Sequence, residues 1–350
     1  MKNLADLWRL LWPQAEPTPL LELPALASLT GVGRVFVKVE GERPLGSFKS
    51  LGGMTAGVRA LAQASGIDDP RDLFSDARSL PRLICASEGN HGLAVAAAAH
   101  KAGTRAIVYL PAEVTEARAA RIEAQGAEVM RVSGTYDDAV LAAEAAAERG
   151  DGLLISDTSS DPNSAVVNAV IEGYGLLAQE LIAQFREPPR ESPSHLFVQA
   201  GVGGLAAAMV EGLQSLLRAP ARFIVVEPES APCVAQALEL GQLTRVDGQL
   251  HTSASMLACG VASAPALRIL QRHAVSTMSV SEAELRMGRA GLRNVGGPST
   301  TTSGAAGVAG LLRAAARPEL RELHRLTSDS VVLLIASERD LSIVGRPADD

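Results

Sequence analysis

Lys49 is the residue of this sequence best suited to covalent chemistry. It stands in the stretch GERPLGSFKSLGG, residues 41–53, between Phe48 and a series of small residues. Gly52 and Gly53 allow other groups to approach the backbone closely. A surface lysine needs no such clearance, whereas an amine that carries a large planar group does. The stretch therefore predicts a reactive amine with open space around it.

A second stretch, ASEGNHG at residues 86–92, follows a predicted strand and begins a predicted helix. Backbone N–H groups at the start of a helix bind anions such as carboxylates. Ser87 and Asn90 add side-chain donors, whereas Glu88 adds a negative charge that opposes an anion. The same residues also suit a plain strand-to-helix turn that Ser87 or Asn90 caps. From this stretch alone, both interpretations stay open.

A glycine-rich loop lies between another predicted strand and helix, in QAGVGGLAAAMV at residues 199–210. Gly201, Gly203 and Gly204 allow backbone amides to surround a phosphate at the helix start. The spacing is neither G-x-G-x-x-G nor a Walker loop. The alternative is a tight turn in an ordinary strand-to-helix connection.

A hydroxyl follows a third predicted strand, in VVLLIASERD at residues 331–340. Ser337 would lie at the carboxyl end of this strand, where open α/β sheets bind ligands. The alternative interpretation is that Ser337 simply ends the strand and binds no ligand.

Together, these four features indicate one cofactor. Pyridoxal 5′-phosphate (PLP) needs a lysine for its Schiff base, an anchor for its phosphate and a partner for its ring nitrogen. The small residues beside Lys49 would then leave room for the ring and for movement of the amine.

The elements that must position these residues alternate along the chain. Short apolar runs precede Ala- and Leu-rich helical stretches, which is typical of parallel sheets covered by helices. We expect an α/β protein with two doubly wound lobes. Residues 50–157 form the smaller domain, residues 1–49 plus 158–350 form the larger one, and the cleft between them is the expected ligand site.

Composition excludes several other classes. The chain has 350 residues, a net charge of −7 and only 3% aromatic residues, so a nucleic-acid partner is disfavoured. No apolar run looks long enough to span a membrane. Three scattered cysteines favour a reducing compartment, so the expected location is the cytoplasm. The six histidines show no zinc-ligand spacing, and no metal is expected.

The motifs GSFKSLGG, ASEGNHG, QAGVGGLA and LLIASERD, in this order, resemble those of the fold-type-II (tryptophan-synthase-β-like) PLP enzymes. The resemblance runs from EPTPLLELPAL, residues 16–26, to about Ser342. Four further stretches, ISDTSSDP, VIEGYGLLAQEL, VVEPESAPCVAQAL and MLACGVASAPALRIL, resemble the diaminopropionate ammonia-lyase branch, as does the acidic residue of SEGNHG.

The resemblance implies roles around the cofactor. Lys49 would bind PLP as a Schiff base and act as a catalytic base. Phe48 would pack beside the ring, Asn90 would hydrogen-bond its phenolic oxygen, and Ser337 would face its nitrogen. A neutral hydroxyl at that nitrogen favours prompt loss of a β-substituent over long-lived carbanion chemistry.

The resemblance also implies two binding loops. Ser87, Gly89 and His91 would bind the substrate carboxylate. The cofactor phosphate would lie in the loop formed by Gly201, Val202, Gly203, Gly204 and Leu205.

The implied activity is α,β-elimination on a small amino acid, which releases ammonia and a 2-oxo acid. Diaminopropionate is the leading substrate. Alternatives are a serine/threonine or hydroxyaspartate-type dehydratase, a β-replacement synthase and a non-catalytic amino-acid sensor. The fold resemblance also implies a homodimer.

Two residues depart from the pattern of the lyase branch. Thr302 stands where that branch has an acidic residue before SGA. Arg339 stands where glycine is usual; it would bring charge to the pocket, bind a second substrate carboxylate or point to solvent. Both bear on the identity of the substrate.

Glu88 matches an aspartate that acts as a second base in diaminopropionate ammonia-lyases. We therefore predict that Glu88 takes a proton from a D-configured substrate or protonates the leaving amine; the alternative is an ion pair with a structural arginine or lysine. Glu88→Gln should lower turnover of one enantiomer selectively in assays with D- and L-substrates. Unchanged turnover of both would remove the catalytic role.

Overall fold

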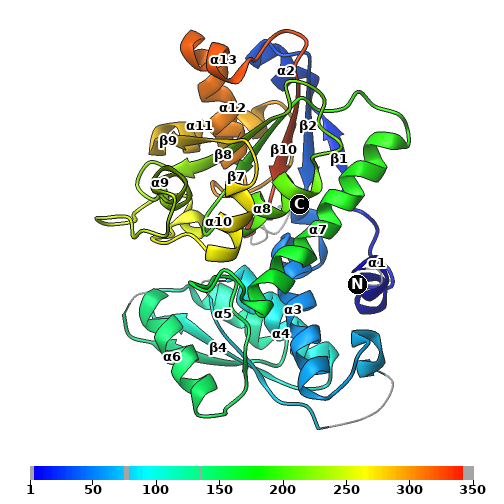
Figure 1. Cartoon of the computed structure of the whole chain (residues 1–350), viewed down its shortest axis with the longest axis vertical. Helices are drawn as coiled ribbons and strands as arrows, with labels where there is room; N and C mark the ends of the chain where they lie inside the picture. Colours follow the sequence, from blue (N-terminus) through cyan, green and yellow to red (C-terminus); the bar gives the residue numbers. More distant parts are fainter. Residues whose placement is uncertain (1–3, 75–78, 88, 135, 342–350) are drawn as a thin grey trace, which may run out of the picture. The chain divides into compact units, whose positions relative to one another are not determined.

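The computed structural model describes residues 4–74, 79–87, 89–134 and 136–341. The chain divides into two compact units, residues 1–16 with 49–176 and residues 17–48 with 177–350 (Figure 1). These units differ from the predicted domains because they group residues 1–16, Lys49 and residues 158–176 with the first unit. The domain boundaries drawn from the sequence stay a proposal.

The second unit contains a six-stranded sheet with the order β1-β2-β10-β7-β8-β9. All neighbouring strands are parallel except β1, which pairs antiparallel with β2 at one edge. The predicted parallel sheet thus has one antiparallel edge strand. The strands are β1 (Leu20–Glu22), β2 (Arg34–Val39), β7 (His195–Gln199), β8 (Arg222–Pro228), β9 (Val275–Val280) and β10 (Val331–Ala336).

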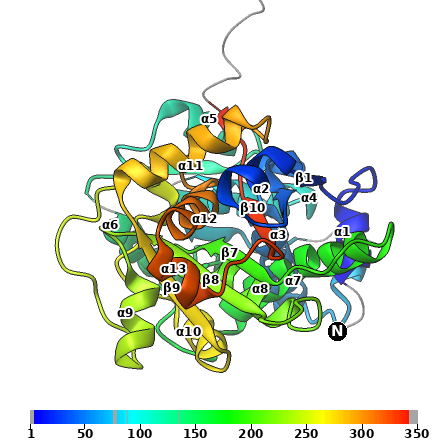
Figure 2. The ribbon, with the colours of Figure 1, turned by 90° about the horizontal axis from the view of Figure 1, so that it is seen from above.

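Helices cover both faces of this sheet, which explains why β10 is apolar and buried at every position. Figure 2 shows one set of helices on one face and another set on the opposite face. The first set is α2 (Pro24–Thr30), α11 (Glu282–Asn294) and α12 (Ala306–Ala316), and the second includes α8 (Gly204–Gly212) and α10 (Ala264–Gln271). The arrangement is doubly wound, as predicted.

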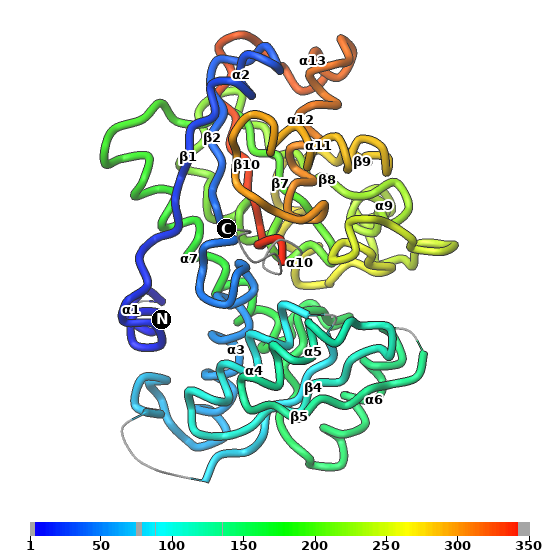
Figure 3. The backbone as a smooth tube through the Cα atoms, turned by 180° about the vertical axis from the view of Figure 1, so that it is seen from behind, coloured from blue at the N-terminus to red at the C-terminus, as the bar shows by residue number. Residues whose placement is uncertain are grey.

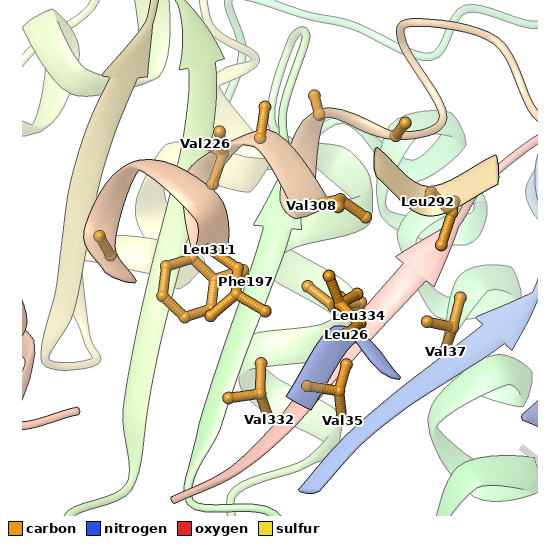
Figure 4. Close-up of a cluster of buried hydrophobic side chains, with 14 of the residues drawn as sticks. Leu26, Val35, Val37, Phe197, Val226, Leu292, Val308, Leu311, Val332 and Leu334 are labelled. Atoms are coloured by element: carbon orange, nitrogen blue, oxygen red, sulfur yellow. The ribbon is translucent and has the colours of Figure 1, made fainter. Parts of the chain in front are cut away.

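The main core of this unit lies between α12 and the sheet (Figure 4). Phe197, Val226 and Leu334 from the strands meet Leu311 from the helix, and all four are buried. Glycines bring α12 close to the strands: a β-carbon at Gly310 would lie 2.6 Å from Val226 Cγ2. Small residues on α12 therefore fix the distance between helix and sheet.

The first unit contains a parallel four-stranded sheet with the order β5-β4-β3-β6 (Figure 3). Ile107 of β4 packs with α6, whereas its neighbour Val108 contacts Gly92 of α4, so the two helices cover opposite faces. The elements are β3 (Leu83–Ala86), α4 (Asn90–Lys101), β4 (Ala106–Pro111), α5 (Glu116–Glu123), β5 (Glu128–Val132), α6 (Tyr136–Glu148) and β6 (Leu153–Leu154).

The remaining elements complete the two units. They are α1 (Leu4–Leu11), η1 (Glu40–Glu42), η2 (Pro44–Gly46), α3 (Lys49–Ala64), η3 (Pro70–Phe74), α9 (Cys233–Leu240), η4 (Ser255–Leu257) and α13 (Pro318–His324).

The long helix α7 (Ala165–Arg186) is sufficiently long and apolar to cross a membrane by length and composition, contrary to the expectation from the sequence. However, 61% of its apolar window is buried inside the protein. Burial of this kind is typical of a core helix.

A buried charge network ties the segment before Lys49 to α7. Arg43 Nη1 donates to Glu180 Oε1 at 2.6 Å, and Arg43 Nη2 donates to Glu40 Oε1 at 2.7 Å. Lys38 Nζ donates to Glu180 Oε2 at 2.8 Å. All four side chains are at most 9% exposed. Two cations and two carboxylates thus neutralise one another away from water.

This network generates a stability prediction. Arg43→Met leaves two buried carboxylates without their shared cation, which should cost about 3–5 kcal/mol of unfolding free energy. Arg34→Met removes the half-exposed pair with Glu22 and should cost at most about 1 kcal/mol. Urea unfolding measures both changes. Equal losses would contradict a special role for the buried network.

Candidate active site

Lys49 is the first residue of α3, and its Nζ donates a short hydrogen bond to Asp157 Oδ2. Their side chains are 23% and 12% exposed. Asp157 is a site residue that was not predicted from the sequence. The signal was present, because Asp157 follows the apolar run LLI just after β6, at the carboxyl end of a parallel strand.

The charge of Asp157 depends on its neighbours. Burial alone would raise the pKa of this carboxyl, but the nearby charge of Lys49 and the hydrogen bond from Lys49 outweigh it. They hold the pKa of Asp157 well below its usual range. The carboxylate is therefore ionised at neutral pH and forms an ion pair with the Lys49 ammonium.

His91 lies in the first turn of α4. Burial lowers the pKa of His91, and the charge of Asp157 opposes this shift without cancelling it. The ring is therefore neutral at neutral pH, and its Nε2 lies 2.8 Å from the carbonyl oxygen of Ile155. This contact fixes the ring beside the segment that precedes Asp157. Its predicted role with the substrate carboxylate stays a prediction.

Ser87 lies before Gly89, the N-cap of α4, and contacts the first turn of this helix. Its Oγ accepts hydrogen bonds from the N–H groups of Gly89 at 3.0 Å and Gly92 at 2.8 Å. The hydroxyl still has a proton to donate, so a carboxylate partner is compatible with these contacts. Asn90 begins α4, and Glu88 lies outside the described residues.

The two glycines after Lys49, Gly52 and Gly53, do not lie beside open space. A β-carbon at Gly52 would lie 2.4 Å from Cε1 of Tyr174, and one at Gly53 would lie 2.6 Å from Cβ of Ala94. The expected open space is thus filled by α7 and α4. These glycines allow α3 to pack closely against its neighbours rather than making room for a cofactor.

The glycine loop of the second unit follows β7 and ends in the first turn of α8. Among the described residues, the N–H groups from Gly201 to Leu205 have no hydrogen-bond acceptor. Gly203 has φ of +97°, a conformation that favours glycine. Unpaired N–H groups at a helix start form a site for an anion.

Tight packing holds this loop in place. A β-carbon at Gly201 would lie 2.9 Å from Cys259 Sγ, and one at Gly203 would lie 3.2 Å from Val234 Cγ2. The Ser263 N–H donates to the carbonyl of Val202 at 2.9 Å. Side chains larger than glycine would displace the loop.

Ser337 follows β10 in the same unit as the glycine loop. Its carbonyl accepts the Phe48 N–H at 3.2 Å, so these two predicted residues lie together. The Ser337 side chain is buried, and its hydroxyl has no hydrogen-bond partner among the described residues. It is therefore available to a ligand.

The structure also places the two residues that depart from the lyase pattern. Arg339 Nε donates to the carbonyl of Gly41 at 3.0 Å, and its N–H donates to the carbonyl of Gly46 at 2.8 Å, so it anchors the segment before Lys49. Thr302 is buried, while its neighbour Thr301 donates to the carboxylate of Glu338. A carboxylate thus still lies against this threonine loop.

Comparison with known proteins identifies the family of this chain. A family model described as pyridoxal-phosphate dependent enzyme matches residues 11–338. The chain belongs to this family. The predicted fold, cofactor and enzyme class are confirmed.

The relatives support the predicted branch. Diaminopropionate ammonia-lyase of Escherichia coli K12 is 31% identical over 93% of this chain and 85% of its own length. The crystal structure of the E. coli holoenzyme superimposes with a TM-score of 0.85 at 30% identity, covering 96% of this chain and 88% of that chain. A T.th. threonine deaminase gives a TM-score of 0.77 at 26% identity, covering 99% of this chain and 98% of that chain.

The residues of this PLP-dependent enzyme fit the cofactor. The unpaired N–H groups of the Gly201–Leu205 loop suit its phosphate, the Ser337 hydroxyl suits its ring nitrogen, and the Lys49 amine suits its aldehyde. When bound, PLP supplies an electron sink for the negative charge that develops at the substrate Cα. The individual residue roles stay predictions.

The phosphate loop generates a test. Gly203→Ala adds a methyl group against Val234 and Ala266 and should weaken PLP binding about tenfold or more. Gly241→Ala is the control, because Gly241 has a similar φ of +71° but no atom within 4 Å of the added group. Titration of the apoprotein with PLP measures both. Similar affinities of the two variants would remove the loop from the phosphate site.

Proposed function

We propose that this protein is a PLP-dependent ammonia-lyase that removes a β-amino group from a diamino acid, with diaminopropionate as the substrate. The single observation that carries this proposal is the half-buried Asp157 carboxylate beside the Lys49 amine. The similarity to diaminopropionate ammonia-lyases supports it.

Asp157 suits a substrate with a second amine. Its carboxylate is ionised and contacts an ammonium group, that of Lys49. Lys49 must be uncharged to act as a base, and in that form it leaves the Asp157 carboxylate without its cation. A substrate β-ammonium group beside Asp157 would supply the missing cation, since a carboxylate largely shielded from water requires a charged partner.

Proton movements at the site then divide between two groups. Lys49 takes the α-proton: a new N–H bond forms as the C–H bond breaks, and the electron pair stays with the substrate carbon. Asp157 holds the leaving amine and keeps it protonated as the C–N bond breaks. Glu88 keeps its predicted role as a second base, and both carboxylates can be tested separately.

The proposal also includes the partner, the cellular location and the oligomeric state of the enzyme. Its partner is a small amino acid, and the expected site of action is the cytoplasm. A homodimer is the expected assembly, by analogy with the fold. E. coli diaminopropionate ammonia-lyase has been crystallised with D-serine and with an aminoacrylate–PLP azomethine intermediate, which supports elimination on small amino acids.

The decisive experiment has two steps. Borohydride treatment of the PLP-loaded protein followed by peptide mapping should label Lys49. A screen of D- and L-amino acids for 2-oxo acid release, without added thiol, should then give the highest rate with diaminopropionate. A higher rate with serine, threonine or a 3-hydroxy dicarboxylate would assign a dehydratase, and dependence on an added nucleophile would assign a β-replacement enzyme.

Asp157 provides the test of substrate class. Asp157→Asn should lower kcat/KM for diaminopropionate by about 100-fold, because the β-ammonium loses a charged hydrogen-bond partner. Residual activity on serine should fall less, since a hydroxyl carries no charge. Asp161→Asn, in the same loop but exposed, is the control and should leave both rates unchanged. An equal loss on both substrates would exclude β-amine recognition by Asp157.

A further inference from the structure

Helices α3 and α7 cross at a point where their backbones touch. A β-carbon at Gly173 of α7 would lie 2.5 Å from the carbonyl oxygen of Leu51 and 2.8 Å from Cα of Gly52. No other residue type fits on either helix at this crossing without moving it. The distance between the two helices is therefore fixed by a pair of glycines.

This close crossing brings Tyr174 to Lys49. A β-carbon at Gly52 would lie 2.4 Å from Cε1 of Tyr174 and 2.8 Å from Cζ, the atom that carries the hydroxyl. Gly52 follows Lys49 by one helical turn, so the two share a face of α3. The Tyr174 side chain is only 1% exposed. Its hydroxyl end is thus held at the Lys49 face by packing.

The electrostatics agree with this geometry. Burial raises the pKa of Tyr174 to about 12; the Asp157 charge acts in the same direction, whereas the charge of Lys49 acts against it. The phenol therefore stays protonated and uncharged at neutral pH. The groups that face this phenol are Lys49 on α3 and Asp157, and His91 on α4 faces that same pair.

We propose that Tyr174 is a positioning residue that, together with Asp157, aims the lone pair of the Lys49 amine. This rests on the proposed function, in which Lys49 is the base. An uncharged amine has two N–H bonds and one lone pair. If the oxygens of Asp157 and Tyr174 accept the two N–H bonds, tetrahedral geometry leaves the lone pair a single direction. An amine held in this way accepts the substrate α-proton without first reorienting.

Tyr174→Phe isolates the hydroxyl, because phenylalanine fills the same space against Gly52. Tyr109→Phe is the matched control, since Tyr109 lies on β4 of the same unit and packs against α6. Attack of the Lys49 lone pair on the PLP aldehyde can be followed in the apoprotein by absorbance and borohydride trapping, without any turnover.

Tyr174→Phe should slow this linkage about tenfold, since a buried hydrogen bond to the amine is lost. Binding of pyridoxine phosphate, which has no aldehyde, should not change, and kcat should fall with KM unchanged. Tyr109→Phe should behave as wild type. A linkage rate in Tyr174→Phe equal to that of Tyr109→Phe would overturn the inference alone. Failure of the wild-type protein to link PLP to Lys49 would instead overturn the proposed function.

If Tyr174→Phe does not fold, 3-fluorotyrosine labelling still tests the contact, because the chain has only three tyrosines. The ¹⁹F resonance of Tyr174, assigned by elimination with Tyr109→Phe and Tyr136→Phe, should shift when PLP is fixed to Lys49 by borohydride. The Tyr109 resonance should not shift. An unchanged ¹⁹F chemical shift of Tyr174 after modification of Lys49 would exclude the contact.

Discussion

Lys49 and Asp157 form a half-buried ion pair, and each charge stabilises the other where water is largely excluded. The charge of each residue depends on the other: Lys49 outweighs the burial that would otherwise raise the pKa of Asp157. Whatever removes the charge of the lysine leaves the carboxylate in need of a new cation. This requirement connects the packing of the unit to the choice of substrate.

Close helix packing positions this pair. Gly53 and Gly57 of α3 face Ala94 and Ala98 of α4, while Gly52 faces α7. Because side chains are small or absent at these contacts, the helices approach closely and their polar residues are held with little freedom. Lys49 is the first residue of α3, so the packing of this helix determines where its amine lies. The rigid packing of α3 therefore fixes the position of the Lys49 amine and also stabilises the unit.

The second unit contributes an anion-binding loop and a hydroxyl, both at the carboxyl ends of neighbouring parallel strands. β7 leads into the glycine loop, and its neighbour β10 leads to Ser337. This edge is where parallel sheets present loops and helix starts, so donors from distant segments of the chain collect there. The N–H groups of the loop are left unpaired by the turn itself, and this makes them available to a phosphate.

The sequence by itself determined the α/β class, the cofactor and the family, because these depend on local patterns: apolar runs, glycine loops after strands, and one lysine among small residues. It also picked out Lys49, Ser337 and the Gly201–Leu205 loop, whose roles stay predictions. Only the tertiary structure brought Asp157 to Lys49 across 108 residues and Tyr174 to Gly52. It also showed that the space beside Gly52 is filled. Such contacts depend on how helices cross, and no local pattern of residues encodes which side chain will occupy the space that a glycine leaves.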